Sequence, residues 1–277
     1  MINYYDHPAL CRSKLAAINI SPYYFWSLYI AKTIDIDSIA MKFGRAFHNS
    51  ALEPQTFDNN FVVEPEYKTK KECGLSIIEQ KLAFSQKNRG KGILTQKENM
   101  DLLFLLTKLQ NRTPAMKLLN SCNQKEVEYF FKLEGLDFKA KIDAVNETAS
   151  TPLVIDLKTS ASSSPNEFSR SVVNYHYAEQ VFLYSYAVEQ KIGVRPIFLF
   201  INICKKEPNE VIVYDASCFS DHGKYQLFKQ IEKYNYCVER WGLCLDTPWE
   251  ANDTDAVIKL ELPLWINNNK ELQQCTI

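Results

Sequence analysis

The chain lacks the features that assign many proteins to a class at once. None of its eight cysteines forms a Cys-x-x-Cys pair, which argues against a zinc ribbon. No run approaches the roughly 20 apolar residues of a membrane span. The apolar stretch 22–31 is short and aromatic, with no charged start before it and no cleavage site after it, so it does not read as a signal peptide. We therefore expect reduced thiols, a cytoplasmic location and no membrane partner.

A large charge of either sign is also missing. The 277 residues include 32 Lys and Arg against 33 Asp and Glu, a formal net charge of −1. A nucleic-acid surface would therefore have to be a local patch. The best candidate is the stretch 81–91, which holds Lys87, Arg89 and Lys91. That stretch is equally typical of a solvated loop. A hydrophobic content of 46% indicates a globular chain with a substantial core.

Two short apolar segments carry the chemistry. One holds Lys139, Lys141 and Asp143, and the other, thirteen residues on, holds Asp156 and Lys158. Side chains alternate along a strand, so the polar residues of each segment share a face. If the strands are neighbours, two carboxylates and an ammonium meet at one spot. Such a group can hold Mg²⁺ and act on a phosphodiester, although a solvated face with an ordinary ion pair has the same pattern.

Two helical stretches add further polar residues. His48 lies one turn after Gly44 on an apolar stripe, where it could be a metal ligand or a core histidine bonded to a carbonyl. The small Gly44 would let another backbone approach the imidazole. Downstream, Gln180 and Tyr184 share one helix face. They could form a buried polar pair, or contact DNA or the site from a helix packed beside the strands.

The periodicities give a coarse organisation of helices first and a mixed α/β region afterwards. Helices are predicted near 22–31, 39–53, 73–88, 95–109, 113–121 and 218–240. Strands are predicted near 126–134, 137–146, 152–159, 196–204 and 210–215, with a hairpin turn at Glu134-Gly135. Ser164-Pro165-Asn166-Glu167 has the form of a capping box. It predicts a helix from Pro165 to Lys191, broken near Asn174-Tyr175.

The order Gly-x-x-x-His, Asp, Asp-x-Lys, Gln-x-x-x-Tyr resembles the RecB-type branch of the PD-(D/E)xK nucleases. More narrowly, the chain resembles the RecE-like (exodeoxyribonuclease VIII) exonucleases of phages and prophages. The narrower resemblance is carried by residues 44–57, 94–119, 126–143 and 156–184, and by Leu262-Pro263-Leu264-Trp265. It covers roughly residues 20–266. One departure is Ile142, where many members carry a proline that is not a ligand.

The resemblance implies an α/β fold with a PD-(D/E)xK core, a mixed central sheet flanked by helices and a helical N-terminal region. Within a single nuclease domain, it implies a mainly helical part over 1–122, a catalytic core over 123–240 and a tail over 241–277. Mg²⁺ or Mn²⁺ is the implied cofactor, and no iron–sulfur cluster is expected. The implied metal ligands are His48, Asp143, Asp156 and the backbone carbonyl of Leu157. Glu126 matches the family's glutamate, with Glu128 as the alternative.

The catalytic group implied by the resemblance consists of Asp143, Asp156, Lys158, Gln180 and Tyr184. Candidate DNA contacts are Lys87, Arg89, Lys91, Lys141 and Arg170. The implied activity is 5′→3′ digestion from double-stranded DNA ends, which leaves 3′ single strands for a RecT-like annealing protein. A homo-oligomeric ring, tetrameric or trimeric, and a bacterial or phage-infected host cell are also implied. The alternatives are a single-strand or structure-selective nuclease and a non-catalytic DNA-binding relative.

Overall fold

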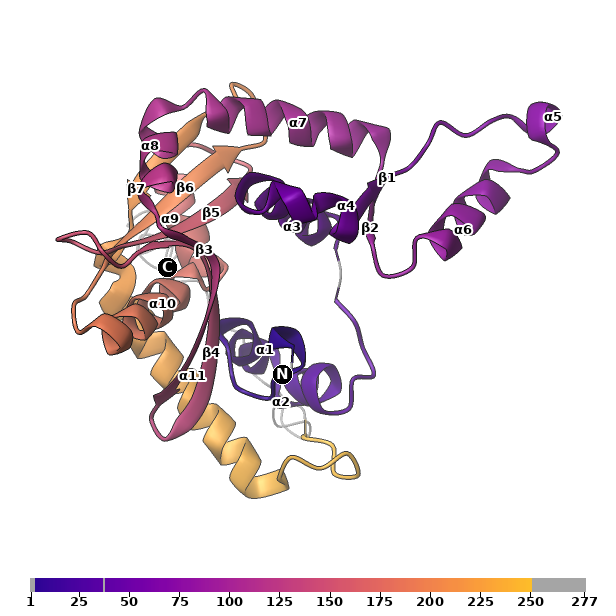
Figure 1. Cartoon of the computed structure of the whole chain (residues 1–277). Coiled ribbons are helices and arrows are strands. Elements are labelled where there is room, and N and C mark those ends of the chain that lie inside the picture. Colours follow the sequence, from indigo (N-terminus) through magenta and orange to yellow (C-terminus); the bar gives the residue numbers. More distant parts are fainter. Residues whose placement is uncertain (1–2, 37, 251–277) are drawn as a thin grey trace, which may run out of the picture.

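The computed structural model describes residues 3–36 and 38–250 (Figure 1). The Leu262-Pro263-Leu264-Trp265 stretch of the family resemblance lies outside the described residues, as does Cys275. Within the described part, helices come first and a five-stranded sheet with further helices follows. This order agrees with the α/β class expected from the sequence. No helix among the described residues is both long and apolar enough to cross a membrane.

Helices dominate the first 122 residues, and their starts are set by side chains. Ser38 accepts a hydrogen bond from the Met41 amide, and Thr95 forms a reciprocal capping box with Glu98. The elements are η1 (Tyr4–Asp6), α1 (Arg12–Ile20), α2 (Pro22–Phe25), η2 (Trp26–Ile30), α3 (Ile39–Leu52), η3 (Pro54–Thr56), α4 (Phe57–Asn60), β1 (Phe61–Val63), α5 (Lys70–Cys73), α6 (Ile77–Lys87), β2 (Gly92–Leu94), α7 (Gln96–Gln110) and α8 (Thr113–Ser121).

The central sheet is mixed and has the order β3-β4-β5-β6-β7. Its strands are β3 (Gln124–Leu133), β4 (Leu136–Asn146), β5 (Leu153–Ser160), β6 (Ile197–Cys204) and β7 (Val211–Asp215). Only β5 and β6 are parallel neighbours. The predicted hairpin turn is present, because Glu134 and Gly135 both have positive φ, at 49° and 76°.

The remaining elements are α9 (Pro165–Asn174), α10 (Tyr177–Ile192), η4 (Ser217–Phe219) and α11 (Ser220–Trp241). Helix α9 begins at Pro165 as predicted, but the Ser164 side chain makes no capping hydrogen bond. The capping box expected there is therefore wrong, and the start of the helix relies on proline at its first position.

Helices cover both faces of the sheet. Ile155 and Leu157 of β5 point toward α3, α7 and α8, whereas Val154 packs with Phe200 of β6 against α9 and α10. A third cluster joins α1 and α2 to α10 and α11, and the buried Trp249 stacks on Phe25 in it, with the ring centroids 5.0 Å apart. Apolar side chains therefore pack against β5 from both sides of the sheet, and a charged side chain on this strand is largely removed from solvent.

Helices α5 and α6 form an arm that projects from the body (Figure 1). No residue of α6 is buried, and Ile78 is 79% exposed. The sequence predicted one helix over 73–88 here. The helix is present but begins four residues later, at Ile77, because Gly74 takes a left-handed conformation with φ of 79° and Ser76 caps a new helix. The prediction also missed α1 and the parallel pair β1–β2, whose three-residue strands are too short for a periodicity signal.

Candidate metal and catalytic site

The candidate site lies where β4 and β5 separate. The two strands pair only through Ala144–Asn146 and Leu153–Ile155, so their ladder ends just before Asp143 and Asp156. On the other side, β3 pairs with β4 at Lys125↔Ala144 and Val127↔Ile142, which puts Glu126 opposite Asp143. Three acidic residues thus lie at one level across three strands. Glu126 has a positive φ of 52°, an uncommon backbone conformation that tends to occur at functional sites.

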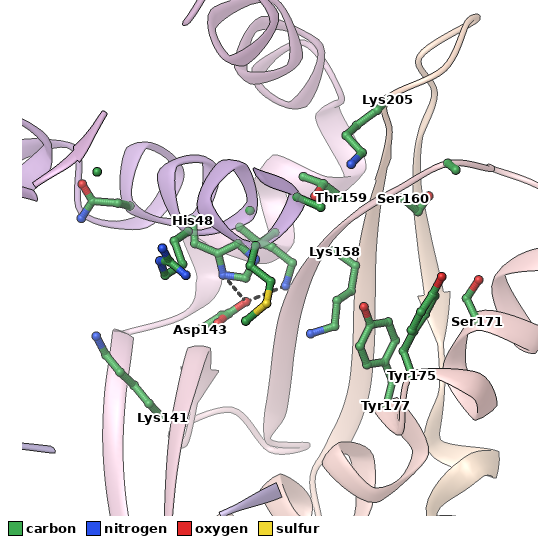
Figure 2. Close-up of a pocket in the computed structure, with 18 of the residues that line it drawn as sticks. His48, Lys141, Asp143, Lys158, Thr159, Ser160, Ser171, Tyr175, Tyr177 and Lys205 are labelled. Atoms are coloured by element: carbon green, nitrogen blue, oxygen red, sulfur yellow. Dashed lines mark hydrogen bonds and ion pairs between the residues drawn. The ribbon is translucent and has the colours of Figure 1, made fainter. Parts of the chain in front are cut away.

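Three side chains meet on the α3 side of this split. One ligand atom each from His48, Glu126 and Asp143 lies within 4.8 Å of the others. The Oδ2 atom of Asp143 is 3.2 Å from His48 Nδ1 and accepts a hydrogen bond of 2.7 Å from the Leu157 amide (Figure 2). The Asp143 carboxylate thus takes the place of a strand partner for Leu157. This explains why the ladder opens here without leaving the amide unpaired.

This donor set fits a divalent cation. Two carboxylates and one imidazole converge, where Asp143 already accepts a hydrogen bond from the Leu157 amide and Glu126 is paired with the Lys141 ammonium. Oxygen ligands suit Mg²⁺ and Mn²⁺, and a neutral imidazole can complete such a site. Of the two glutamates that the sequence left open, the structure places Glu126 in this group, whereas Glu128 is exposed.

Asp156, Lys158 and Gln180 form a second group on the α10 side. Asp156 is only 1% exposed, and its carboxylate contacts the Lys158 ammonium and accepts a hydrogen bond from the Gln180 amide. Lys158 Nζ also donates to Gln180 Oε1 at 3.1 Å. The structure therefore joins Asp156 to Lys158 and Gln180, and not to the three-residue group around Asp143. The role of the Leu157 carbonyl as a ligand stays a prediction.

The electrostatics of the two groups differ. Burial raises the pKa of Asp156 to about 6, because the Lys158 ammonium only partly offsets the loss of solvent and the charge of Asp143 adds to it. Burial also acts on Asp143, but His48, Lys158 and the Leu157 amide together hold its pKa below the ordinary value. The pKa of Glu126 is raised by burial and by Asp143. The charged forms of Asp156 and Glu126 are therefore disfavoured, and a cation bound beside these carboxylates would offset that cost.

Tyr184 reaches the same region from α10, one turn beyond Gln180. Burial, followed by the charge of Asp156, raises the pKa of its phenol well above the ordinary value. The phenol therefore keeps its proton at neutral pH and can donate a hydrogen bond. The Gln-x-x-x-Tyr spacing predicted a shared helix face, and the structure turns that face to the site.

A cleft of about 1310 Å³ runs past both groups. Tyr5 and Arg12 line it on one side, and the loop Ser160–Ser162 and Lys205 line it on another. At Gly44, a Cβ atom would meet only the Thr159 hydroxyl oxygen, at 4.0 Å. The expectation that another backbone approaches His48 at this glycine is therefore wrong. The absence of a side chain at Gly44 instead leaves open space in the cleft beside the imidazole.

The predicted DNA contacts divide into two sets. Lys141 lines the cleft, where its ammonium is 2.8 Å from Glu126. Lys87, Arg89, Lys91 and Arg170 are exposed but do not line it. Lys91 donates to the Asp58 carbonyl at 2.6 Å, which ties the base of the arm to α4. The structure does not bring these four residues to the site, so their part in DNA binding stays a prediction.

Sequence reasoning missed several lining residues, among them Arg12, Tyr175 and Tyr177. Arg12 belongs to α1, which was not predicted as a helix. The two tyrosines flank the break between α9 and α10, and the sequence did predict that break. Two aromatic residues at a helix break beside a site were the available signal.

Comparisons with known proteins agree with the fold. The family model described as "PDDEXK-like domain of unknown function (DUF3799)" matches residues 17–245. A solved structure described as a "putative exonuclease" from Eubacterium rectale superposes with a TM-score of 0.62 at 14% identity, over 97% of this chain and 98% of the other. A second solved structure, SSO0001, reaches a TM-score of 0.27 at 14% identity, over 67% of this chain and 86% of the other, and the fold assignment does not rest on it. No curated protein matches the chain.

Proposed function

The chain belongs to the PDDEXK-like domain family (DUF3799), and on that premise we propose that it is a divalent-metal-dependent deoxyribonuclease. The observation that carries the proposal is the meeting of His48, Glu126 and Asp143 beside the Lys158 ammonium, at the point where β4 and β5 separate. Divalent metals are what nucleases of this fold use, and Mg²⁺ or Mn²⁺ is the cation proposed here.

His48, Glu126 and Asp143 would hold the cation, and Asp156, which the sequence resemblance implied as a further ligand, would stay in contact with Lys158 and Gln180 beside it. When bound, the cation supplies a more acidic water and neutralises charge on the phosphate. Hydrolysis joins a water oxygen to phosphorus and breaks the bond from phosphorus to a sugar oxygen. The water's protons pass to that sugar oxygen and to solvent.

The chain's own residues complete the site. Lys158, held by Asp156 and Gln180, places its ammonium where negative charge grows on the phosphate. Tyr184 presents a hydroxyl that stays protonated and can bind a phosphate oxygen. Gln180 fixes the carboxylate of Asp156, so the lysine is oriented before the substrate arrives.

The finer activity that we propose is RecE-like digestion from double-stranded DNA ends. The order of the motifs from Gly44 to Tyr184 supports it, and the resemblance brings with it 5′→3′ polarity and 3′ single strands passed to an annealing protein. Linear duplex, circular duplex and single strands of equal sequence separate this activity from its alternatives. Digestion of the linear duplex alone is the expected result. Cleavage of circular or single-stranded DNA would indicate a structure-selective or single-strand nuclease.

Substitution at the site tests the catalytic assignment. We expect Asp143→Asn, Asp156→Ala and Lys158→Ala to lower the rate by at least about 10²- to 10³-fold, the range for loss of one group that stabilises a transition state. The matched control is Asp137→Asn, an exposed carboxylate on the same strand β4. Near-normal, EDTA-sensitive cleavage by Asp156→Ala would place the site elsewhere. Binding of DNA without cleavage by the wild type, in either Mg²⁺ or Mn²⁺, would indicate a non-catalytic relative.

We also propose a homo-oligomeric ring, because an enclosed duplex cannot dissociate between steps, whereas phosphate contacts alone allow it to leave. Phe25, Trp26 and Trp249 are large aromatic residues that could have formed a subunit contact, but they are buried within one chain. The interface would therefore use other residues. Light scattering should give a trimer or tetramer. A monomer at micromolar concentration that still degrades long duplexes processively would contradict the ring.

A further inference from the structure

The turn between α9 and α10 is held in an unusual conformation beside the site. His176 has a positive φ of 59°, which is uncommon for a residue other than glycine. Its Nδ1 atom is 2.7 Å from Glu179 Oε1, and the Gln230 amide of α11 donates to the same oxygen at 2.9 Å. Glu179 is only 2% exposed. Side chains of α10 and α11 therefore hold the turn in this conformation. Uncommon backbone conformations that are held in this way tend to occur at functional sites.

This turn carries a tyrosine on each side, and both line the cleft (Figure 2). The ring centres of Tyr177 and Phe200 are 6.0 Å apart, and the Lys158 ammonium is 4.5 Å from the centre of the Tyr177 ring. The ring of Tyr175 lies 5.8 Å from that of Tyr177 and is 62% exposed. Arg12 donates to the Tyr175 carbonyl at 3.4 Å, which brings a second cation to the same wall.

We propose that Tyr175 and Tyr177 form a base-stacking surface, and that the substrate strand passes this wall of the cleft as unpaired nucleotides. This inference rests on the proposed function, because Lys158 marks where the phosphate lies. A nucleotide whose phosphate meets Lys158 carries its base one sugar away, toward the Tyr177 ring and then Tyr175. In a duplex the base faces are covered by their neighbours, so an exposed ring here is useful only to a strand that has been opened. Stacking on aromatic rings is tolerant of sequence, as a nuclease that degrades any DNA requires.

Binding without cleavage tests the surface directly. The probe is a fluorescein-labelled oligothymidylate, measured by anisotropy in EDTA, together with a strand of the same length made of abasic nucleotides. Stacking is strong enough that Tyr175→Ala and Tyr177→Ala should each weaken binding of the oligothymidylate by about 10- to 100-fold. Tyr175→Phe, which keeps the ring, should bind as the wild type does. The matched control is Tyr225→Ala, because Tyr225 is 56% exposed on α11 and does not line the cleft.

The abasic strand separates stacking from phosphate binding. The wild type should bind it more weakly than either alanine variant binds the oligothymidylate, because each variant keeps one of the two rings, and only Tyr175→Ala combined with Tyr177→Ala should bind both strands alike. If both alanine variants bind oligothymidylate as tightly as the wild type, or lose the same factor with the abasic strand, the base-stacking surface is refuted. Cleavage that survives in either alanine variant without a loss of binding leaves the nuclease standing and overturns only this inference. Ring-dependent binding with no cleavage under any metal leaves this inference standing and overturns the nuclease.

Discussion

Helix α11 packs closely against α10, the helix that carries Gln180 and Tyr184, and Gly223 of α11 tests that contact. An added Cβ at this position would lie 1.9 Å from the Ala178 carbonyl oxygen and 2.9 Å from the Glu179 amide nitrogen. These are backbone atoms of α10, so no side-chain rotation relieves the clash. In a close-packed interior the helices would have to separate by about 1 Å or more. Helix α10 carries Gln180 and Tyr184, so the site would move with it.

The size of the effect follows from two opposing terms. Overpacking costs about 1–3 kcal/mol, and a backbone obstacle puts Gly223→Ala at the upper end of that range. Alanine is favoured over glycine inside a helix by about 1 kcal/mol, which offsets part of the cost. We expect the free energy of unfolding to fall by about 2 kcal/mol in this variant.

Gly44 in α3 supplies the matched control, because a Cβ there would meet only the Thr159 hydroxyl oxygen, at 4.0 Å. Gly44→Ala keeps the helix-propensity gain without the clash, so it should raise the free energy of unfolding by up to about 1 kcal/mol. Urea denaturation of the two variants and the wild type measures the difference, provided the slope with denaturant is unchanged. Equal stability of Gly223→Ala and the wild type would refute the backbone contact. A loss in Gly44→Ala as large as that in Gly223→Ala would show that glycine is needed for another reason.

Three further predictions concern charge and exposure. Asp156→Asn should stabilise the metal-free protein in EDTA at pH 8, by no more than about 3 kcal/mol for a pKa raised to about 6. The gain should shrink as the pH falls from about 6 toward 4, because the folded carboxyl takes up its proton in that range, and it should vanish below the ordinary pKa of aspartate, where the unfolded chain is protonated too. A loss of stability at pH 8 would contradict this. Glu147 accepts hydrogen bonds from Tyr129 at 2.6 Å and from Lys191 at 2.7 Å. Burial by itself would raise the pKa of Glu147, but these hydrogen bonds outweigh it and the pKa is lowered. Glu147→Gln should therefore cost about 1–2 kcal/mol at pH 7, and urea titrations should show that difference fading in acid as the wild-type carboxylate is protonated. Limited proteolysis should cut first between residues 64 and 91, since α6 buries no residue and should unfold locally more easily than the sheet. A first cut within the sheet would contradict this prediction.

The sequence determined the strands of the site and the residues they carry. Alternation of apolar and polar residues over 137–146 and 152–159 predicted two strands that carry Asp143, Asp156 and Lys158 and the face each side chain takes, because the side-chain period of a strand is fixed by the backbone. The helical spacing of Gln180 and Tyr184 placed both on one face of α10 for the same kind of reason. These are local consequences of backbone geometry, and the structure has them where the sequence predicted.

The tertiary structure decided how these residues are grouped. That His48 and Glu126 join Asp143, while Asp156 joins Lys158 and Gln180, depends on where the ladder between β4 and β5 ends. The inner place of Tyr177 and the outer place of Tyr175 depend on a left-handed turn fixed by Glu179 and Gln230, and Gln230 lies 51 residues from Glu179 along the chain. Strand separation and helix docking are set by contacts between distant segments, which no local periodicity encodes. The sequence by itself therefore determined which residues could form a nuclease site, and the packing of distant elements decided which of them meet and which wall of the cleft is left open.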